Sequence, residues 1–167
     1  LGIRLLLEAG TAVGVVSGRG GDATERRLLE LGLDRRLVAL GSRDKGADLS
    51  RVQVEAGQVT DAETAVMGDD LPDLPILMRA GFAACPADGA PDVAAVCHFV
   101  CGSKGGEGAA REVAELILKA QHRWSDVVRG WMGSRPAAEV GPAAAATKTR
   151  RANRPSREDS WAGAASR

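Results

Sequence analysis

Short apolar runs alternate with amphipathic segments along most of this chain, and the alternation restricts the fold more than any other feature. The apolar runs are rich in strand-forming residues and cover residues 11–17, 36–40, 64–68, 82–86 and 98–101. Segments with helical periodicity flank them, at residues 2–10, 23–33, 46–57, 71–81, 90–96 and 109–124. This alternation predicts an α/β fold, a three-layer, doubly wound domain with a largely parallel sheet. Helices on both faces of such a sheet explain why its strands read as almost continuous apolar runs.

The composition changes sharply towards the carboxyl end of the chain. Residues 134–167 are rich in Ala, Arg, Ser and Pro without an apolar period, which predicts a disordered tail. We therefore expect the folded domain to lie within residues 1–122 of the 167. Over the whole chain 22 basic residues balance 22 acidic ones, so the net charge favours neither nucleic-acid nor membrane partners. No apolar run approaches the roughly 18 residues of a membrane span.

Three cysteines, Cys85, Cys97 and Cys101, are an odd number in a chain whose first residues resemble an amphipathic helix and not an export signal. Such cysteines are typical of a reducing compartment, so we expect a cytoplasmic protein. The segment that holds Cys97, His98 and Cys101 does not favour zinc, because neighbouring side chains of a strand point to opposite faces.

Polar groups follow three of the predicted strands at their carboxyl ends, where ligands bind in doubly wound folds. They are Ser17, Gly18 and Arg19 after the first strand, Ser42, Asp44 and Lys45 after the second, and Asp69 and Asp70 after the third. A hydroxyl, an ammonium and a pair of carboxylates are groups that phosphoryl transfer uses. Crowded carboxylates repel one another, so the acidic pair predicts a bound divalent cation. Mg²⁺ suits both the oxygen ligands and a phosphate partner.

Each of these side chains also has a purely structural interpretation. Ser17 is suited to capping a turn, and Lys45 to lying in solvent. Asp69 and Asp70 are suited to capping the following helix and interacting with its dipole. We expect Asp73, one turn into that helix, to have only such a structural role. The combination, in this order and at these strand ends, favours a phosphate and magnesium site.

Three motifs, VVSGR, DKGADL and VMGDDLPDLPIL, resemble the second, third and fourth motifs of the haloacid dehalogenase-like hydrolases, whose fold is Rossmann-like. Residues 2–121, with the closing segment GGEGAAREV, are similar to the 3-deoxy-D-manno-octulosonate 8-phosphate phosphatase subgroup. The resemblance implies a Mg²⁺-dependent phosphomonoester hydrolase that acts on an acidic sugar phosphate through an aspartyl-phosphate. It also implies a homotetramer and a role in lipopolysaccharide biosynthesis.

The same resemblance implies roles for individual residues. Ser17 and Gly18 would bind the phosphoryl group, Lys45 would pair with the nucleophile and the phosphate as a catalytic residue, and Arg19 would contact the acidic sugar. Asp69 and Asp70 would ligate magnesium. Arg111 and the glycine segment 105–108 would close over a site, in this or a neighbouring subunit. One residue departs from the pattern, because Glu107 lies where relatives often carry a basic residue. This acidic side chain argues against an anion contact at position 107.

The D-x-D motif that opens the family pattern does not precede Ser17. In the family its first Asp is the nucleophile, its second Asp is the general acid and base, and its strand is central to the sheet. We therefore expect an N-terminally truncated chain with little turnover as written, because binding groups do not replace an aspartyl nucleophile. We also expect two unpaired strand edges, and hence poor solubility.

Two other function classes stay open on the sequence alone. Domains of this kind also occur fused to acylneuraminate cytidylyltransferases or as small subunits of phenylphosphate carboxylase, so the chain is also compatible with an accessory phosphate-binding subunit. The remaining class is a non-catalytic binding module in which Asp69 and Asp70 only cap a helix.

Overall fold

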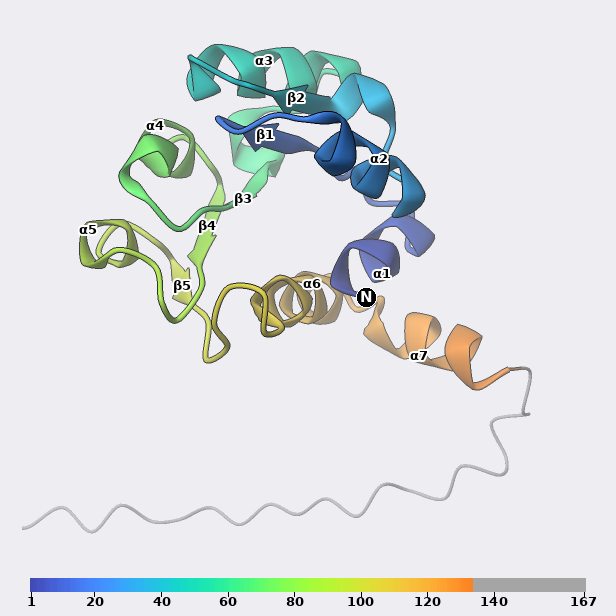
Figure 1. Ribbon diagram of the computed structural model, residues 1–167. Coiled ribbons are helices and arrows are strands. Elements are labelled where there is room, and N and C mark those ends of the chain that lie inside the picture. The colour runs from blue at the N-terminus through green and yellow to red at the C-terminus, as the bar shows by residue number, and fades with distance from the viewer. Residues whose placement is uncertain (134–167) are drawn as a thin grey trace, which may run out of the picture. The chain divides into compact units, whose positions relative to one another are not determined.

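The computed structural model describes residues 1–133, in which strands and helices alternate as the sequence predicts (Figure 1). The strands are β1 (Val15–Ser17), β2 (Val38–Leu40), β3 (Ala65–Met67), β4 (Phe82–Cys85) and β5 (Phe99–Val100). The helices are α1 (Gly2–Glu8), α2 (Asp22–Glu30), α3 (Lys45–Glu55), α4 (Leu74–Leu77), α5 (Pro91–Ala94), α6 (Ala109–Ala120) and α7 (Trp124–Met132). Three 3₁₀ turns, η1 (Arg35–Leu37), η2 (Asp61–Glu63) and η3 (Leu71–Asp73), precede β2, β3 and α4. The predicted tail, residues 134–167, lies outside the described residues.

Every strand pair is parallel, which confirms the predicted α/β class. β1 pairs with β2, and β3, β4 and β5 pair in that order. Within residues 1–133 no ladder joins β1 to β3, so the strands form two sheets, and each of these two strands is paired on one side only. The two unpaired edges agree with the expectation from the sequence, whereas N-terminal truncation stays a prediction.

Helix packing joins the two sheets. α3 contacts β1, β2 and α4, and α4 in turn contacts β3 and β4. One apolar cluster carries this packing, with Leu49 of α3, Val66 of β3 and Leu77 of α4 at most 9% exposed. Burial of three such side chains stabilises the arrangement by several kcal/mol, at about 2 kcal/mol each. One core therefore holds α3, which carries Lys45, together with β3 and α4, which flank the acidic turn.

The end of the domain differs from the prediction of one closing helix over residues 109–124. α6 ends at Ala120, and His122 adopts a left-handed backbone with φ of 56°. The chain then turns and forms α7, which the sequence analysis does not anticipate. Val127 of α7 packs against Leu5 of α1 and Leu118 of α6. The apolar face of α7 explains the turn, because a continued straight helix would carry that face away from α1.

One helix start also differs from the prediction. The helix predicted over residues 23–33 begins one residue earlier, at Asp22, and Gly21 is its N-cap. Gly21 has a positive φ of 152°, which glycine adopts without a Cβ penalty. The Asp22 carboxylate still lies in the first turn, where a negative charge interacts favourably with the helix dipole.

Candidate functional site

The turn after β3 gives each of its three carboxylates a different environment. Gly68 begins the turn, and a Cβ at this position would lie 2.6 Å from the Cβ of Asp73, so the close approach requires glycine. Asp70 is the N-cap of η3, and its Oδ1 accepts a hydrogen bond from the Leu71 backbone N–H at 2.8 Å. Asp69 is exposed and is held through its backbone, since its N–H donates to Asp73 and its C=O accepts from Ala90. Among residues 1–133 its carboxylate is therefore open to solvent or a ligand.

Asp73 has the structural role expected from the sequence, and in addition it contacts Lys45. Its Oδ1 accepts from the Lys45 Nζ at 2.5 Å. Its Oδ2 accepts from the backbone N–H groups of Asp69 and Asp70, at 3.1 and 3.3 Å. The side chains of Lys45 and Asp73 are only 16% and 10% exposed, so the ion pair is largely removed from water. One carboxylate thus orients both the lysine and the backbone of the acidic turn.

The sequence around Lys45 places its ammonium group at the start of α3. Asp44 caps this helix, because its Oδ1 accepts from the Ala47 backbone N–H at 3.0 Å. Lys45 is the first helical residue and follows the loop after β2. A lysine bound to a carboxylate retains further N–H donors, so Lys45 can hold Asp73 and a ligand oxygen together. The solvated lysine considered from the sequence is wrong, since its side chain is mostly buried.

The first predicted group, Ser17 with its neighbours, lies at the end of β1. The Ser17 Oγ accepts from the Arg19 backbone N–H at 3.2 Å, which forms a local turn. The Ser17 C=O accepts from the Ser42 N–H at 2.9 Å, so the loops after β1 and β2 are adjacent. Gly18 is exposed, and a Cβ at this position would lie 3.7 Å from the Ser42 carbonyl oxygen. The surroundings therefore leave room for a side chain at position 18. No hydrogen bond among the described residues joins Ser17 to Lys45 or Asp69.

One buried polar atom in this region lies in the loop after β2. The Ser42 Oγ is buried and has no hydrogen-bond partner within residues 1–133. A buried hydroxyl without a partner costs about 1–3 kcal/mol, unless a water or ligand satisfies it. The sequence places Ser42 among the polar residues after the second strand, but a small residue in a loop gives no pattern that assigns it a role.

Arg111 and the glycine segment are engaged with other partners. The Arg111 Nε lies 2.9 Å from the Glu115 Oε1, and this hydrogen bond is the main cause of a lowered Glu115 pKa. The Gly105 N–H donates to the Asp88 Oδ1 at 2.7 Å. The structure therefore ties the glycine loop to the loop after β4, and within the described chain no hydrogen bond brings Arg111 to Lys45. Glu107 is exposed in the same loop.

The side chains at the acidic turn suit Mg²⁺ better than metals that need three or more protein ligands. Within the described residues no group of three or more His, Cys, Asp or Glu side chains is arranged to hold a metal ion. Asp69 and Asp70 are both exposed and adjacent, and Asp73 is occupied by Lys45. Mg²⁺ is usually held by one or two carboxylates, with waters and phosphate oxygens completing six ligands. The exposed carboxylates of Asp69 and Asp70 match this ligand preference in kind and number.

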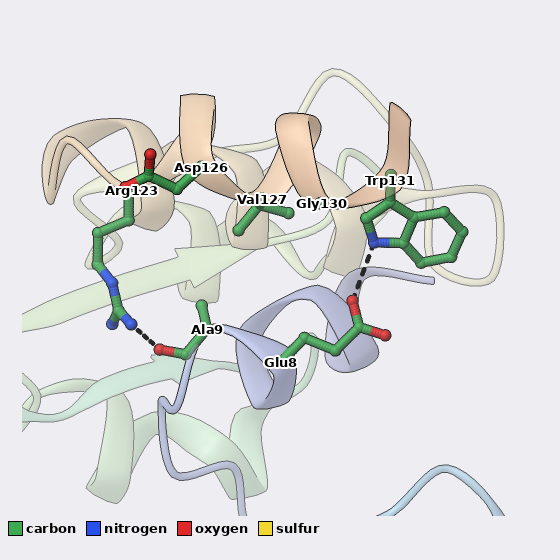
Figure 2. A pocket seen from close by; sticks show the side chains of 7 residues that line it. All are labelled: Glu8, Ala9, Arg123, Asp126, Val127, Gly130 and Trp131. Carbon is green, nitrogen blue, oxygen red and sulfur yellow. Dashed lines mark hydrogen bonds between the residues drawn. The ribbon is translucent and has the colours of Figure 1, made fainter. Parts of the chain in front are cut away.

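A cleft of about 640 Å³ lies elsewhere, between α1 and α7 (Figure 2). On one side the Trp131 Nε1 donates to the Glu8 Oε2 at 2.9 Å. On the other side the Arg123 guanidinium donates to the Ala9 carbonyl. None of the predicted site residues lines this cleft, so it does not bear on the chemistry of the acidic turn.

Comparison with known proteins identifies close relatives of the chain. It is 36% identical over 136 residues to the 3-deoxy-D-manno-octulosonate 8-phosphate phosphatase KdsC of Haemophilus influenzae, covering 80% of this chain and 74% of the relative. It is 35% identical over 126 residues to the KdsC of Yersinia pestis, covering 73% of this chain and 64% of the relative.

A solved structure of a third relative agrees with the described fold. The Moraxella catarrhalis 3-deoxy-D-manno-octulosonate 8-phosphate phosphatase, in complex with magnesium ion, phosphate ion and KDO, matches with a TM-score of 0.73 and 33% identity. That match covers 78% of this chain and 73% of the relative. No protein-family model matches the chain. None of the helices in the described part is long and apolar enough to cross a membrane.

Proposed function

This chain belongs to the 3-deoxy-D-manno-octulosonate 8-phosphate phosphatase family of haloacid dehalogenase-like hydrolases, and on that premise we propose that it binds an acidic sugar phosphate and Mg²⁺ for phosphomonoester hydrolysis. The observation that carries the proposal is the Lys45–Asp73 ion pair beside two exposed carboxylates, Asp69 and Asp70. A fixed ammonium next to a hard-cation site is the arrangement that stabilises negative charge on a transferring phosphoryl group.

Each residue of the cluster has a role that follows from its contacts. Asp73 holds the Lys45 ammonium in place. The remaining N–H donors of Lys45 would then bind a phosphoryl oxygen. Asp69 provides the open carboxylate for Mg²⁺, and Asp70, with one oxygen engaged by its own turn, holds the ion directly or through water. When bound, the cation neutralises phosphate charge and orients the ester.

The substrate proposal rests on the relatives and on the loop after β1. The Moraxella relative holds phosphate and KDO, an acidic sugar, in one structure. In this chain Ser17 lies at the end of β1, where its hydroxyl can donate to a phosphoryl oxygen while its Oγ accepts from Arg19. The exposed Arg19 side chain suits the sugar carboxylate. We assign Arg111 no substrate contact within its own chain, since Glu115 engages it.

The hydrolytic step in this proposal passes through an aspartyl-phosphate, as the family resemblance implies. The printed sequence has no D-x-D motif, so the residues described here supply binding and orientation and not the nucleophile. A non-catalytic accessory subunit gains no support from the relatives named above, all of which are phosphatases. The proposal extends to a cytoplasmic homotetramer in lipopolysaccharide biosynthesis, and the three free cysteines support a reducing compartment.

Ligand-dependent stability tests this proposal without requiring turnover. Thermal unfolding is followed in Mg²⁺ and inorganic phosphate, singly and together, for the wild-type chain and Asp69→Ala. A ligand present at 100 times its dissociation constant stabilises the folded form by about 2.7 kcal/mol. We expect stabilisation by Mg²⁺ with phosphate in the wild type and none in Asp69→Ala.

The matched control is Asp126→Ala, which removes an exposed carboxylate from α7, where Asp126 pairs with Arg129. This variant is expected to respond to both ligands like the wild type. Equal Mg²⁺ responses in Asp69→Ala and the wild type would exclude Asp69 as a ligand. No response of the wild-type chain to either ligand would contradict the proposed site.

A further inference from the structure

A second set of contacts, separate from the Lys45–Asp73 pair, holds the first turn of α3. Arg79 follows α4, and its Nη1 donates to the Gly46 carbonyl at 2.9 Å. Its Nη2 donates to the Ser50 Oγ at 3.1 Å and approaches the Gln53 Oε1 at 3.3 Å. Positions 46, 50 and 53 lie on one face of the helix because a turn takes 3.6 residues. One guanidinium therefore spans two turns of α3, beginning at the residue next to Lys45.

The same guanidinium is anchored to the segment that leads into β3. Arg79 Nη2 and Nε lie 2.9 and 3.2 Å from the two oxygens of Asp61 in η2. Gln53, which is 7% exposed, donates to Asp61 and to the Thr64 Oγ1, each at 2.9 Å. The hydrogen bond from Arg79 is the main cause of a lowered Asp61 pKa, with the bond from Gln53 second. Both hydrogen bonds therefore favour the charged form of this carboxylate.

These contacts frame α4 at both ends. Asp73 stands at its start and binds the side chain of Lys45, and Arg79 follows its end and binds the backbone of the next residue, Gly46. Asp61 fixes the same arginine to the segment that leads into β3, and the turn with Asp69 follows that strand. α3 cannot slide relative to the acidic turn without breaking one of these two anchors. The Asp73 contact is made by Lys45 itself, whereas the Arg79 side chain bonds to none of the candidate site residues and acts on the helix backbone beside Lys45.

We propose that Arg79 is a positioning residue, which holds the first turn of α3 so that the Lys45 ammonium stays in register with the Asp69–Asp73 turn. The role depends on the shape of the guanidinium as well as on its charge. The planar guanidinium donates to a carbonyl, a hydroxyl and a carboxylate at the same time. A lysine ammonium on a flexible side chain does not reproduce this geometry. The consequence for phosphate binding rests on the proposed function, whereas the position of Lys45 does not.

The first test measures the position of Lys45 without any ligand. The chain is treated briefly with an amine-acylating reagent, and the labelling rate of each lysine is read by mass spectrometry, with Lys119 as the internal reference. Lys45 is 16% exposed at its side chain, against 55% for Lys119, so slow labelling is expected in the wild type. In Arg79→Ala the Lys45 rate is expected to rise roughly fivefold, a loss of restraint of the size seen for remote positioning contacts.

Arg51→Ala is the matched control. Arg51 also lies on α3 and also donates to backbone carbonyls, of Arg36 and Val38 at 2.9 and 3.3 Å, but these belong to η1 and β2. This variant loses a comparable anchor and is expected to leave the Lys45 labelling rate unchanged. Arg79→Lys, which keeps the charge and most of the packing, is expected to fall between wild type and Arg79→Ala, and it serves if the alanine variant fails to fold.

The second test uses Mg²⁺ with inorganic phosphate as the probe, by calorimetric titration. Arg79→Ala is expected to weaken phosphate binding roughly tenfold while the response to Mg²⁺ alone stays unchanged, because Asp69 is not displaced. An unchanged Lys45 labelling rate in Arg79→Ala, or an equal rise in Arg51→Ala, would overturn the positioning role. A rise specific to Arg79→Ala supports that role even if no protein in the series binds phosphate, and that last outcome would count against the proposed function alone.

Discussion

The Lys45–Asp73 pair should behave as a largely buried ion pair, and a double-mutant cycle measures this. The variants are Asp73→Asn, Lys45→Met and their combination. Asparagine keeps the size of the side chain and leaves an oxygen for the backbone N–H groups of Asp69 and Asp70, so the substitution isolates the charge. Removing one partner of a buried pair costs about 3–5 kcal/mol. Because the side chains keep 10% and 16% exposure, we expect the lower part of that range, about 3 kcal/mol, for Asp73→Asn.

The cycle then separates the interaction from the loss of packing. Lys45→Met alone leaves Asp73 with its two backbone donors, so a smaller loss of about 1–2 kcal/mol is expected. The coupling energy between the two positions should be about 2 kcal/mol, within the usual range for residues in contact. The measurement is urea unfolding of the four proteins, followed by circular dichroism, with equal m-values as the test that the denatured states are comparable.

An exposed pair provides the reference for this cycle. Arg27 and Glu30 lie 3.2 Å apart on α2, with side chains 70% and 55% exposed. Pairs of this kind contribute about 0.2–0.5 kcal/mol. A coupling energy for Lys45 and Asp73 no larger than that of Arg27 and Glu30 would refute the assignment of Asp73 as the residue that fixes the lysine.

Three further changes test the packing and the charges around the site. Leu118→Ala, at a fully buried position, should destabilise the chain by about 2–5 kcal/mol in urea unfolding. Gly81→Ala should destabilise it by more than about 2 kcal/mol, since the new Cβ would lie 2.2 Å from the Ala62 carbonyl oxygen, whereas Gly130→Ala in α7, with no atom within 4 Å, should stabilise it by about 0.5–1 kcal/mol. Backbone N–H groups of the loop after β5 hold the Glu112 pKa below its ordinary value of 4.5. The extra stability of the wild type over Glu112→Gln should therefore be full above pH 4.5 and vanish as the pH falls through the lower pKa of the folded state. Thermal unfolding over a series of acidic pH values measures this difference.

The sequence predicts the fold class well because the signals for it are local. Each strand is a short apolar run, and each helix has its own periodicity and, at α3, its own cap in Asp44. The division into two sheets follows from pairing between distant segments, and local sequence patterns do not predict such pairing. The break at His122 was missed for a related reason: a left-handed residue other than glycine leaves no mark in the sequence, and the need for it arises from packing of α7 on α1.

The site was predicted in part, and the missed residue shows why. The sequence nominates Lys45 and Asp69 because each follows a strand at its carboxyl end. It does not predict the contact of Asp73 with Lys45, although Asp73 stands four positions after Asp69, a spacing that turns its carboxylate back towards the backbone of the acidic turn. That spacing is a signal that could have been used. Arg79 has no such signal, since its partners Gly46 and Asp61 are fixed only by the packed structure.

The division of the strands also changes which contacts determine the geometry of the site. Lys45 follows β2 in one sheet, and Asp69 follows β3 in the other, with no ladder between the two sheets in residues 1–133. In a continuous sheet, strand pairing would set the distance between two such loops. Here the contact between α3 and α4 sets it, through buried side chains such as Leu49 and Ile76 and through the polar anchors at both ends of α4. Substitutions in this helix contact should therefore disturb the relation of lysine to carboxylate more than equally destabilising substitutions in α6, although none of them touches a ligand.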